Sequence, residues 1–283
     1  LIPFINPKDN RIHAVFNQTI TATGRISCTD PNLQNLPSHE GEGKNIKKSF
    51  KAKDGYIYVD ADYSQIELRV LAHISKDETM IEAFKNDEDI HKQVASRVFS
   101  VPITKVTKEQ RSNAKAVNFG IIYGITAFGL SQQLKIGRKE AQNYIDNYLK
   151  KYGGIKIFME DIVKKAEEEG FVETAFGRRR YVPELKSNNY VVRQFGTRVA
   201  MNTPIQGTAA DIMKIAMNKV FDEIKNLDAK VVLQVHDELI LEVKEDQKEQ
   251  AKEILKSSME NATKLDVPLK VELSEGKTWF ELK

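Results

Sequence analysis

Two apolar runs near the C-terminus, at 231–235 and 238–243, are separated by only two polar residues, His236 and Asp237. Two β-rich runs with such a short interruption predict a β-hairpin with a tight polar turn. A third β-rich run, YIYVDA at 56–61, predicts a buried strand. The chain therefore carries strand-forming segments towards both of its ends.

Helical patterns dominate the middle of the chain. Thr107 is expected to be the N-cap of the helix at 108–122, and Gly124 and Gly129 are expected to mark its end. A long helix from about residue 190 is expected to break near Pro204 and to resume at 208–226, because proline removes a helical hydrogen bond. Long helices between strand-bearing ends predict an α+β fold, with a helical insertion in a sheet domain. The other expected elements are helices at 65–75, 77–86, 89–99, 108–122, 138–151, 155–169 and 245–263, a hairpin at 171–182 and a strand near 269–273.

Composition excludes several classes of protein. The chain has 283 residues, of which 41% are apolar, and its 43 Lys and Arg nearly balance its 40 Asp and Glu, which argues against a disordered chain. This length suits one large or two small domains. The sequence has no run of about 18 apolar residues, so no membrane-spanning helix is predicted. The single cysteine, Cys28, excludes an internal disulfide and a Cys-based zinc site, which favours a reducing, intracellular compartment. Because the chain begins at Leu1 without Met, we expect it to be an excerpt of a longer protein.

Charge is distributed unevenly. The net charge of +3 does not by itself indicate a nucleic-acid partner. Lysines gather in KNIKKSFKAK at 44–53, residues 178–180 are three arginines, and acidic residues gather at 167–169 and along 245–260. These runs fit either phosphate-binding patches or solvated faces that compensate one another.

Two aspartates stand at the ends of predicted strands. Asp62 directly follows the predicted strand at 56–61, and Asp237 stands at the hairpin tip. Asp60 lies two residues before Asp62, so the two side chains are expected on the same face of the strand. Aspartates that end neighbouring buried strands would repel each other, and a divalent cation would remove that repulsion. Mg²⁺ prefers such carboxylates together with substrate phosphates, and paired metals suit phosphoryl transfer. The alternative is that Asp237 is simply a turn-forming residue.

The predicted helix at 108–122 carries a stripe of cationic and aromatic side chains. Arg111, Lys115, Phe119 and Tyr123 follow one another at four-residue spacing. Like charges at this spacing destabilise a helix unless an anion faces them, and Arg and Lys bind phosphate. The aromatic rings offer surfaces on which a base can stack, and the missing side chains of Gly120 and Gly124 would allow close approach of a ring. The alternative is a surface helix with a partly apolar face.

Three ordered motifs carry a family resemblance. Residues 62–69 read DYSQIELR, residues 111–124 read RSNAKAVNFGIIYG, and 236–238 read HDE within QVHDEL. Together they resemble motifs A, B and C of the DNA polymerase I family, family A. TATGRISCTDPNLQNLP at 21–37, DIHKQVASRVF at 89–99 and NTPIQGTAADI at 202–212 agree, so the resemblance covers nearly the whole chain.

The resemblance implies a metal site on the strands. Asp62 and Asp237 would hold two Mg²⁺ ions, for which Mn²⁺ can substitute, with help from the carbonyl of Tyr63. Glu238 would be an auxiliary carboxylate near the primer end. His236 would help to hold the primer terminus.

The resemblance also implies a site for the incoming nucleotide. Arg111 and Lys115 would clamp the triphosphate, and Lys115 would act as a general acid towards pyrophosphate. Glu67 resembles a steric gate that excludes a ribose 2′-hydroxyl; burial of Glu67 in the core is a poor alternative, because charged residues are seldom buried unpaired. The other nucleotide-binding residues would be Gln65 and His91 beside the clamp, Phe119 against the sugar and Tyr123 near the templating base.

Residues that would line the primer–template are polar and able to reach minor-groove acceptors shared by every base pair. Phosphate contacts are expected from the lysines of 44–53 and from arginines 178–180, where the family pattern is weaker. Cys28 stands where relatives commonly carry Ser, and we interpret it as tolerated rather than catalytic. The residues expected to contact the primer–template are Arg25, Asn32, Gln34, Asn35, Arg198, Asn202 and Gln206.

The resemblance finally implies an organisation and an activity. Residues 1–75 and 191–283 would form a palm and 76–190 the fingers, with no thumb, no proofreading domain and no membrane contact. The expected activity is template-directed DNA synthesis from dNTPs on primer–template DNA, in replication or repair inside the cell. The protein is expected to be a monomer, in which this chain normally follows a thumb and exonuclease domains. A single-subunit RNA polymerase, which Glu67 argues against, and a non-catalytic duplex-binding module, which the metal-binding carboxylates argue against, are the alternatives.

Overall fold

A computed structural model describes residues 1–37 and 42–282 of the chain. The chain divides into two compact units. The first unit comprises 1–66, 209–264 and 269–283, and the second comprises 67–208 and 265–268. Among the described residues, no helix combines the length and the apolar character that crossing a membrane requires.

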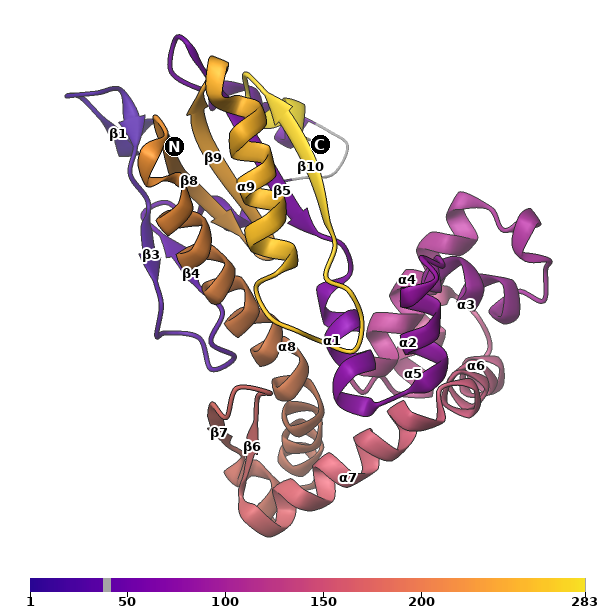
Figure 1. Cartoon of the computed structure of the whole chain (residues 1–283). Coiled ribbons are helices and arrows are strands. Elements are labelled where there is room, and N and C mark those ends of the chain that lie inside the picture. The colour runs from indigo at the N-terminus through magenta and orange to yellow at the C-terminus, as the bar shows by residue number, and fades with distance from the viewer. Residues whose placement is uncertain (38–41, 283) are drawn as a thin grey trace. The chain divides into compact units, whose positions relative to one another are not determined.

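The first unit is built on an antiparallel sheet with strand order β10-β5-β9-β8 (Figure 1). Strands β8 (Ala229–Val235) and β9 (Glu238–Lys244) form the predicted hairpin, and β5 (Tyr56–Tyr63) extends the predicted strand by two residues. The last strand, β10 (Val271–Gly276), pairs with the other edge of β5. Two small antiparallel pairs accompany this sheet, β1 (Ile5–Asn6) with β2 (Arg11–Ile12) and β3 (Val15–Asn17) with β4 (Ser27–Thr29).

The two faces of the sheet carry different side chains because successive residues of a strand alternate in direction. One face is apolar and packs on helix α9 (Lys248–Glu260), to which Tyr63 is tied by a 2.7 Å hydrogen bond from its hydroxyl to the carbonyl oxygen of Met259. The other face carries Tyr58, Asp60 and Asp62 in alternation. The core on this second face contains Cys28, Leu33, Tyr58, Leu233, Ile240, Trp279 and Leu282.

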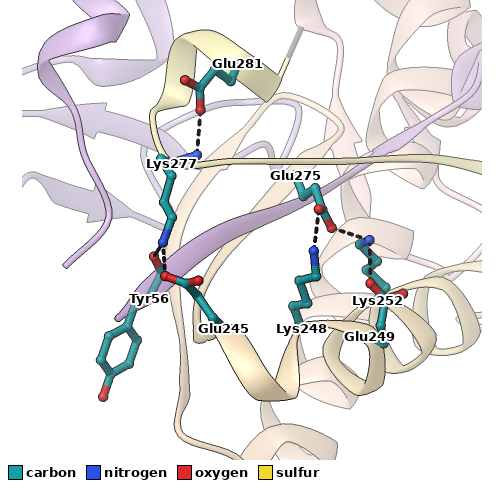
Figure 2. Close-up of polar contacts among 8 residues, drawn as sticks. All are labelled: Tyr56, Glu245, Lys248, Glu249, Lys252, Glu275, Lys277 and Glu281. Atoms are coloured by element: carbon teal, nitrogen blue, oxygen red, sulfur yellow. Dashed lines mark hydrogen bonds and ion pairs between the residues drawn. The ribbon is translucent and has the colours of Figure 1, made fainter. Parts of the chain in front are cut away.

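Charged side chains fasten the edge strand β10 to its neighbours (Figure 2). Lys248 and Lys252 on α9 both bind Glu275 on β10, the first at 2.6 Å. Lys277, just after β10, donates to the carbonyl oxygen of Tyr56 at 3.0 Å. Each such pair is only partly buried, so it contributes no more than about 1 kcal/mol, and the network fixes the position of the strand more than it stabilises the fold.

The second unit is mainly helical, and its helices begin at the N-caps that their sequences provide. Asp77, Asp89 and Thr126 each accept a backbone N–H of the first helical turn, and Thr107 forms a capping box with Gln110. The helices are α1 (Ile66–Ser75), α2 (Glu78–Lys85), α3 (Ile90–Val98), α4 (Lys108–Ile122), α5 (Ala127–Leu134), α6 (Arg138–Lys151) and α7 (Gly153–Glu169), followed by the hairpin of β6 (Phe171–Glu173) and β7 (Arg179–Tyr181).

The long helix α8 corrects one prediction. It runs without a break from Tyr190 to Glu223, with Pro204 inside it. The hydroxyl of Thr203 donates to the carbonyl oxygen of Val199 at 2.7 Å, so side-chain bonding accompanies the proline in this turn. Helix α5 is an element that the sequence did not predict, because Gly129 was interpreted as an end signal for α4. The predicted helix at 245–263 is a 3-10 turn at Glu245–Gln247 followed by α9.

Candidate functional site

The carboxylates of the first unit gather where β5 meets the β8–β9 hairpin. Asp62 is the cross-strand partner of Glu238, and the backbone N–H of Tyr63 donates to the carbonyl oxygen of Asp237 at 3.0 Å. His236 occupies the left-handed region with φ of 55°, which forms the two-residue turn. Residues 175 positions apart in the sequence, Asp62 and Asp237, are therefore brought to neighbouring strand ends by sheet register.

This arrangement suits a divalent cation. Carboxylates directly opposite each other on neighbouring strands repel, and Glu238 is only 3% exposed, so solvent screens it poorly. Oxygen donors of this kind are the ligands that Mg²⁺ prefers. Within the described residues, however, no group of three or more His, Cys, Asp or Glu is arranged as a complete metal-binding cluster, so ligation by Asp62, Asp237 and Tyr63 stays a prediction.

The neighbouring aspartate on the same face, Asp60, has a different environment. It is 2% exposed, and the hydroxyl of Ser274 donates to its carboxylate at 3.1 Å. Gln65, two residues after β5, has φ of 54°, and its side-chain oxygen is buried without a hydrogen-bond partner among the described residues. Gln65 thus has acceptor capacity left for a ligand.

Arg25 and Gln34, two of the residues predicted to contact DNA, lie close to the hairpin turn that contains His236. Arg25 and His236 line one small cavity of about 20 Å³ together with Gln234. The side-chain amide of Gln34 donates to the carbonyl and side-chain oxygens of Gln234 at 3.1 and 2.9 Å, and the side chain of Gln234 in turn donates to the carbonyl oxygen of His236. Asn32 caps the 3-10 turn Leu33–Asn35 by accepting the N–H of Gln34, and Asn32 and Asn35 are exposed.

In the second unit, the predicted stripe lies on α4, and its arginine is held by an acid that sequence reasoning did not single out. Arg111 Nε donates to Asp89 Oδ2 at 2.6 Å, whereas Lys115 is exposed. Burial raises the pKa of Asp89, but the hydrogen bond from Arg111 and the N–H of Lys92 outweigh burial, so this pKa is lowered overall. Asp89 opens the quoted segment DIHKQVASRVF, which is the signal that could have identified it.

His91 is buried beside α4, and Asn118 is a second residue that the sequence reasoning missed. The side-chain amide nitrogen of Asn118 lies 2.7 Å from His91 Nδ1, and the two residues are 0% and 2% exposed. Burial, followed by the charge of Arg111, lowers the pKa of His91 to about 4, so the ring is neutral. If the amide donates to Nδ1, the proton lies on Nε2, which is buried and lacks a partner among the described residues.

The proposed gate and the aromatic residues also meet in this unit. Glu67 is 7% exposed, which the sequence argument disfavoured, but it is not buried unpaired, because the hydroxyl of Tyr123 donates to Glu67 Oε2. The ring of Phe119 lies between those of His91 and Tyr123, at centroid distances of 6.0 and 6.1 Å.

Gly120 in α4 and Gly124 just after it do not leave open space for a ligand ring, which corrects that expectation. A Cβ at Gly120 would lie 3.1 Å from the side chain of Ile125. A Cβ at Gly124 would lie 2.6 Å from the end of Met201, and the φ of Gly124 is +70°. The space beside these glycines is filled by the chain itself.

The remaining predicted DNA contacts are placed as follows. Arg198, Asn202 and Gln206 are half-buried and follow one another at four-residue spacing on α8, so they share a stripe of that helix. Each arginine of 178–180 has an intramolecular partner: Arg178 donates to the carbonyl oxygen of Gly207, Arg179 pairs with Glu173, and Arg180 donates to Thr203.

Among the lysines of 44–53, three lie over aromatic rings, and Lys53 is 5.0 Å from the centroid of the Tyr56 ring. Lys47 and Lys48 lie over Trp279 and Phe280, each 4.5 Å from the ring centroid. The side chain of Lys44 lies outside the described residues. Cys28 is buried, and it is the chain's single, free cysteine.

The fold and these sites define an α+β protein whose sheet carries paired carboxylates and whose inserted helices carry a cationic stripe. The family model of DNA polymerase family A matches residues 1–281, and the chain belongs to that family. This confirms the family resemblance and the predicted fold class of palm and fingers type.

Similar proteins are polymerases. The chain is 53% identical to DNA polymerase I of Caldicellulosiruptor bescii and 52% identical to that of Bacillus subtilis; each match covers all of this chain but only 34% and 32% of the relatives. A solved structure of the polymerase domain of Pol1 from M. smegmatis, in complex with DNA primer–template and dNTP, matches with a TM-score of 0.96 and 46% identity over 99% of this chain and 50% of that one. The chain thus spans about a third of the length of the curated relatives that it matches.

Proposed function

We propose that this chain carries out template-directed DNA synthesis, adding deoxynucleotides to the 3′ end of a primer and releasing pyrophosphate. The observation that carries the proposal is the register of β5 and β9, which sets Asp62 opposite Glu238 and bonds Tyr63 to Asp237, in a chain of DNA polymerase family A. The relatives named as DNA polymerase I and the similar domain bound to primer–template and dNTP support the choice of substrates.

We propose that residues 1–75 and 191–283 act as the palm and 76–190 as the fingers. The two compact units divide at other positions, 66/67 and 208/209, and residues 265–268 belong to the second unit. In the palm, Asp62 and Asp237 would hold divalent cations with the carbonyl of Tyr63, and Glu238 and His236 would lie at the primer end. Two bound Mg²⁺ ions would make the primer 3′-hydroxyl more acidic and stabilise the charge of the leaving pyrophosphate.

In the fingers, Arg111 and Lys115 would bind the triphosphate, and Lys115 would donate a proton to the leaving pyrophosphate. Phosphate oxygens would compete with Asp89 for Arg111, and the template base would compete with Glu67 for Tyr123. Glu67 would then be free to exclude a ribose 2′-hydroxyl, while Phe119 would pack on the sugar. Gln65 would add a contact to the bound nucleotide.

We also propose that Asn118 is a positioning residue for His91. By donating to Nδ1 it would keep the proton on Nε2, the nitrogen available to donate to a phosphate oxygen. Asn118→Asp would reverse the bond, move the neutral proton to Nδ1 and raise the KM for dNTP several-fold with a smaller change in kcat. The ¹⁵N NMR spectrum of the His91 ring reports the tautomer directly, and an unchanged tautomer in Asn118→Asp would refute this role.

Primer extension tests the proposed activity. The chain and its Asp62→Ala variant would be given a DNA primer–template, dNTPs and Mg²⁺, and binding to the same primer–template would be followed by fluorescence anisotropy. Extension by the chain and none by the variant, at equal binding, is expected. Tight binding without extension would instead identify a duplex-binding module, and faster extension with ribonucleotides would identify an RNA polymerase.

A further inference from the structure

A second pocket lies in the helical unit between α3 and α6. It has a volume of about 380 Å³, within the range of roughly 300–1,000 Å³ that is typical of small-ligand sites. Its walls come from Val94, Arg97 and Val98 on α3 and from the α6 segment ending at Tyr152. None of the residues of the α4 site lines it, so the pocket is a separate site in the same unit.

One wall of the pocket is aromatic. Tyr148 and Tyr152 are 4% and 0% exposed, and their ring centroids lie 4.8 Å apart. Both hydroxyls are buried and have no hydrogen-bond partner among the described residues. A buried phenol normally has a partner, so these two residues hold unused hydrogen-bonding capacity behind the wall. The accessible ring of the wall is that of Tyr144, which also lines the pocket and is half-buried.

The rest of the pocket is cationic. Arg97, Lys150 and Lys151 all line it, and none of its lining residues is an Asp or Glu. In the part of the chain that the structure describes, none of the three cations forms an ion pair. A lining that is cationic without an acidic residue favours an anion, and Arg and Lys are the usual partners of phosphate.

Lys151 is the most constrained of these cations. Its ammonium donates to Gln93 Oε1 at 2.7 Å and lies 4.8 Å from the centroid of the Tyr152 ring. Burial, and then the charge of Arg97, lower the pKa of Lys151 to about 8, although the carboxylates of Glu88 and Asp77 act in the opposite direction. An anion beside Lys151 would restore the charged form of the ammonium.

We propose that this pocket binds a small aromatic anion of the nucleoside monophosphate class, with its base against the tyrosine wall and its phosphate on Arg97, Lys150 and Lys151. The half-buried ring of Tyr144 offers a surface on which any base stacks, and the three cations offer the charge that a phosphate needs. A bounded pocket favours a single free nucleotide over a continuous strand. The inference stands on residues outside the proposed polymerase site and does not depend on it.

Ligand binding to this pocket should depend on pH. The affinity for a phosphate ligand should fall by about tenfold between pH 7 and pH 9, because Lys151 loses its proton through this range whereas the phosphate stays a dianion. Replacing Lys151 by an uncharged side chain of similar length should both weaken binding and flatten this profile.

Isothermal titration with dAMP as the probe, in the presence of EDTA, tests the proposal. The variants are Lys151→Met, which removes the charge; Val98→Phe, which fills the pocket; and Lys139→Met, a matched control at an exposed position of α6 outside it. Lys115→Met reports binding at the α4 stripe instead. Circular dichroism and a thermal unfolding curve check that Lys151→Met folds.

Saturable dAMP binding by the wild type, Lys139→Met and Lys115→Met, with at least tenfold weaker binding by Lys151→Met and Val98→Phe, is the expected result. Equal binding by Lys151→Met, loss of binding in Lys115→Met, or no saturation up to about 10 mM would overturn the proposal. Inorganic phosphate that binds as tightly as dAMP would remove the aromatic part of the proposal. A single-stranded oligonucleotide that binds more tightly than dAMP, and loses this advantage in Lys151→Met, would replace the free nucleotide by DNA and also overturn it.

Discussion

Two regions of the molecule place their polar side chains by different means. The sheet edge of the first unit is the end of β5 and β9 that carries Asp62, Asp237 and Glu238. The α4 cluster of the second unit consists of Arg111 and Tyr123 with their partners Asp89 and Glu67. At the sheet edge, the positions of the carboxylates are set by backbone hydrogen bonds. Asp62 lies opposite Glu238 in the ladder of β5 and β9, and the backbone N–H of Tyr63 donates to the carbonyl oxygen of Asp237. A ladder of backbone bonds is unaffected when one side chain is exchanged. This edge is therefore suited to hold fixed ligands for a cation.

In the α4 cluster, side chains hold one another. Arg111 is held by Asp89, and Tyr123 is held by Glu67. In the proposed function, a bound nucleotide would compete with these bonds. The comparison teaches that substitutions at the sheet edge should remove chemistry while preserving the fold, whereas substitutions in the α4 cluster should change selectivity and affinity in smaller steps.

The largest effect is expected for Asp237→Ala. Extension should fall by roughly 10³-fold or more, because loss of a metal-binding carboxylate removes several kcal/mol of transition-state stabilisation. Primer–template binding should stay nearly unchanged, since the hairpin contact of Asp237 uses its backbone oxygen. Single-turnover extension and anisotropy measure the two quantities, with the exposed Asp246→Ala as the matched control. Retained extension would remove Asp237 from the metal site.

Glu67→Ala should have the next largest effect, on sugar selectivity. Discrimination against ribonucleotides should fall roughly 10- to 100-fold, because a gate made of one side chain is worth about 1–3 kcal/mol. The ratio of kcat/KM for dNTP and rNTP is the measurement. Tyr123→Phe is the control, since it breaks the same hydrogen bond while keeping the carboxylate. Unchanged selectivity in Glu67→Ala would show that Glu67 serves only to bind Tyr123.

His91 should make the second unit sensitive to acid. The pKa of His91 is about 4 in the folded state and near 6.5 in the unfolded state, so between these pH values the ring is protonated in the unfolded chain and neutral in the folded chain. Its stabilising contribution is complete above pH 6.5 and is lost as the pH falls towards 4, by about 2 kcal/mol between pH 7 and 5. Urea unfolding at both pH values should show this loss in the wild type and not in His91→Gln. An equal loss in His91→Gln would contradict the assignment, and His13→Gln serves as an exposed control.

The smallest effect is expected for Phe119→Tyr. The added hydroxyl can replace the contact that a missing 3′-hydroxyl leaves unmade, so dideoxynucleotides should be accepted several-fold better, which corresponds to about 1 kcal/mol. Competition between ddNTP and dNTP in primer extension is the measurement, with Phe128→Tyr on α5 as the control because Phe128 is exposed. Unchanged termination would place Phe119 away from the sugar.

Local sequence signals predicted most of the elements correctly. The two-residue interruption at His236 and Asp237 forms the hairpin turn, and Thr107 caps α4 at the expected residue. The failures lie where tertiary packing overrides a local signal. Pro204 does not break α8, and Gly129 lies inside α5 rather than ending a helix.

The candidate site divides in the same way. The motifs identified the residue types of the carboxylates and of the α4 stripe, because spacing along one strand or helix is written in the sequence. Asp89 and Asn118 were missed as partners, because a hydrogen bond to a residue some 20 to 30 positions away has no local periodicity. The roles of these residues in catalysis stay predictions for the experiments above.

By itself the sequence determined where the strands of the main sheet and most of the helices form, which of their faces are apolar, and the family to which the chain belongs. Only the tertiary structure decided that Asp62 faces Glu238, that Asn118 bonds His91, and that the α3–α6 pocket has cations without carboxylates. The physical reason is that hydrophobic periodicity and capping act over a few neighbouring residues. Register, burial and charge compensation depend instead on segments that meet only when the chain has folded.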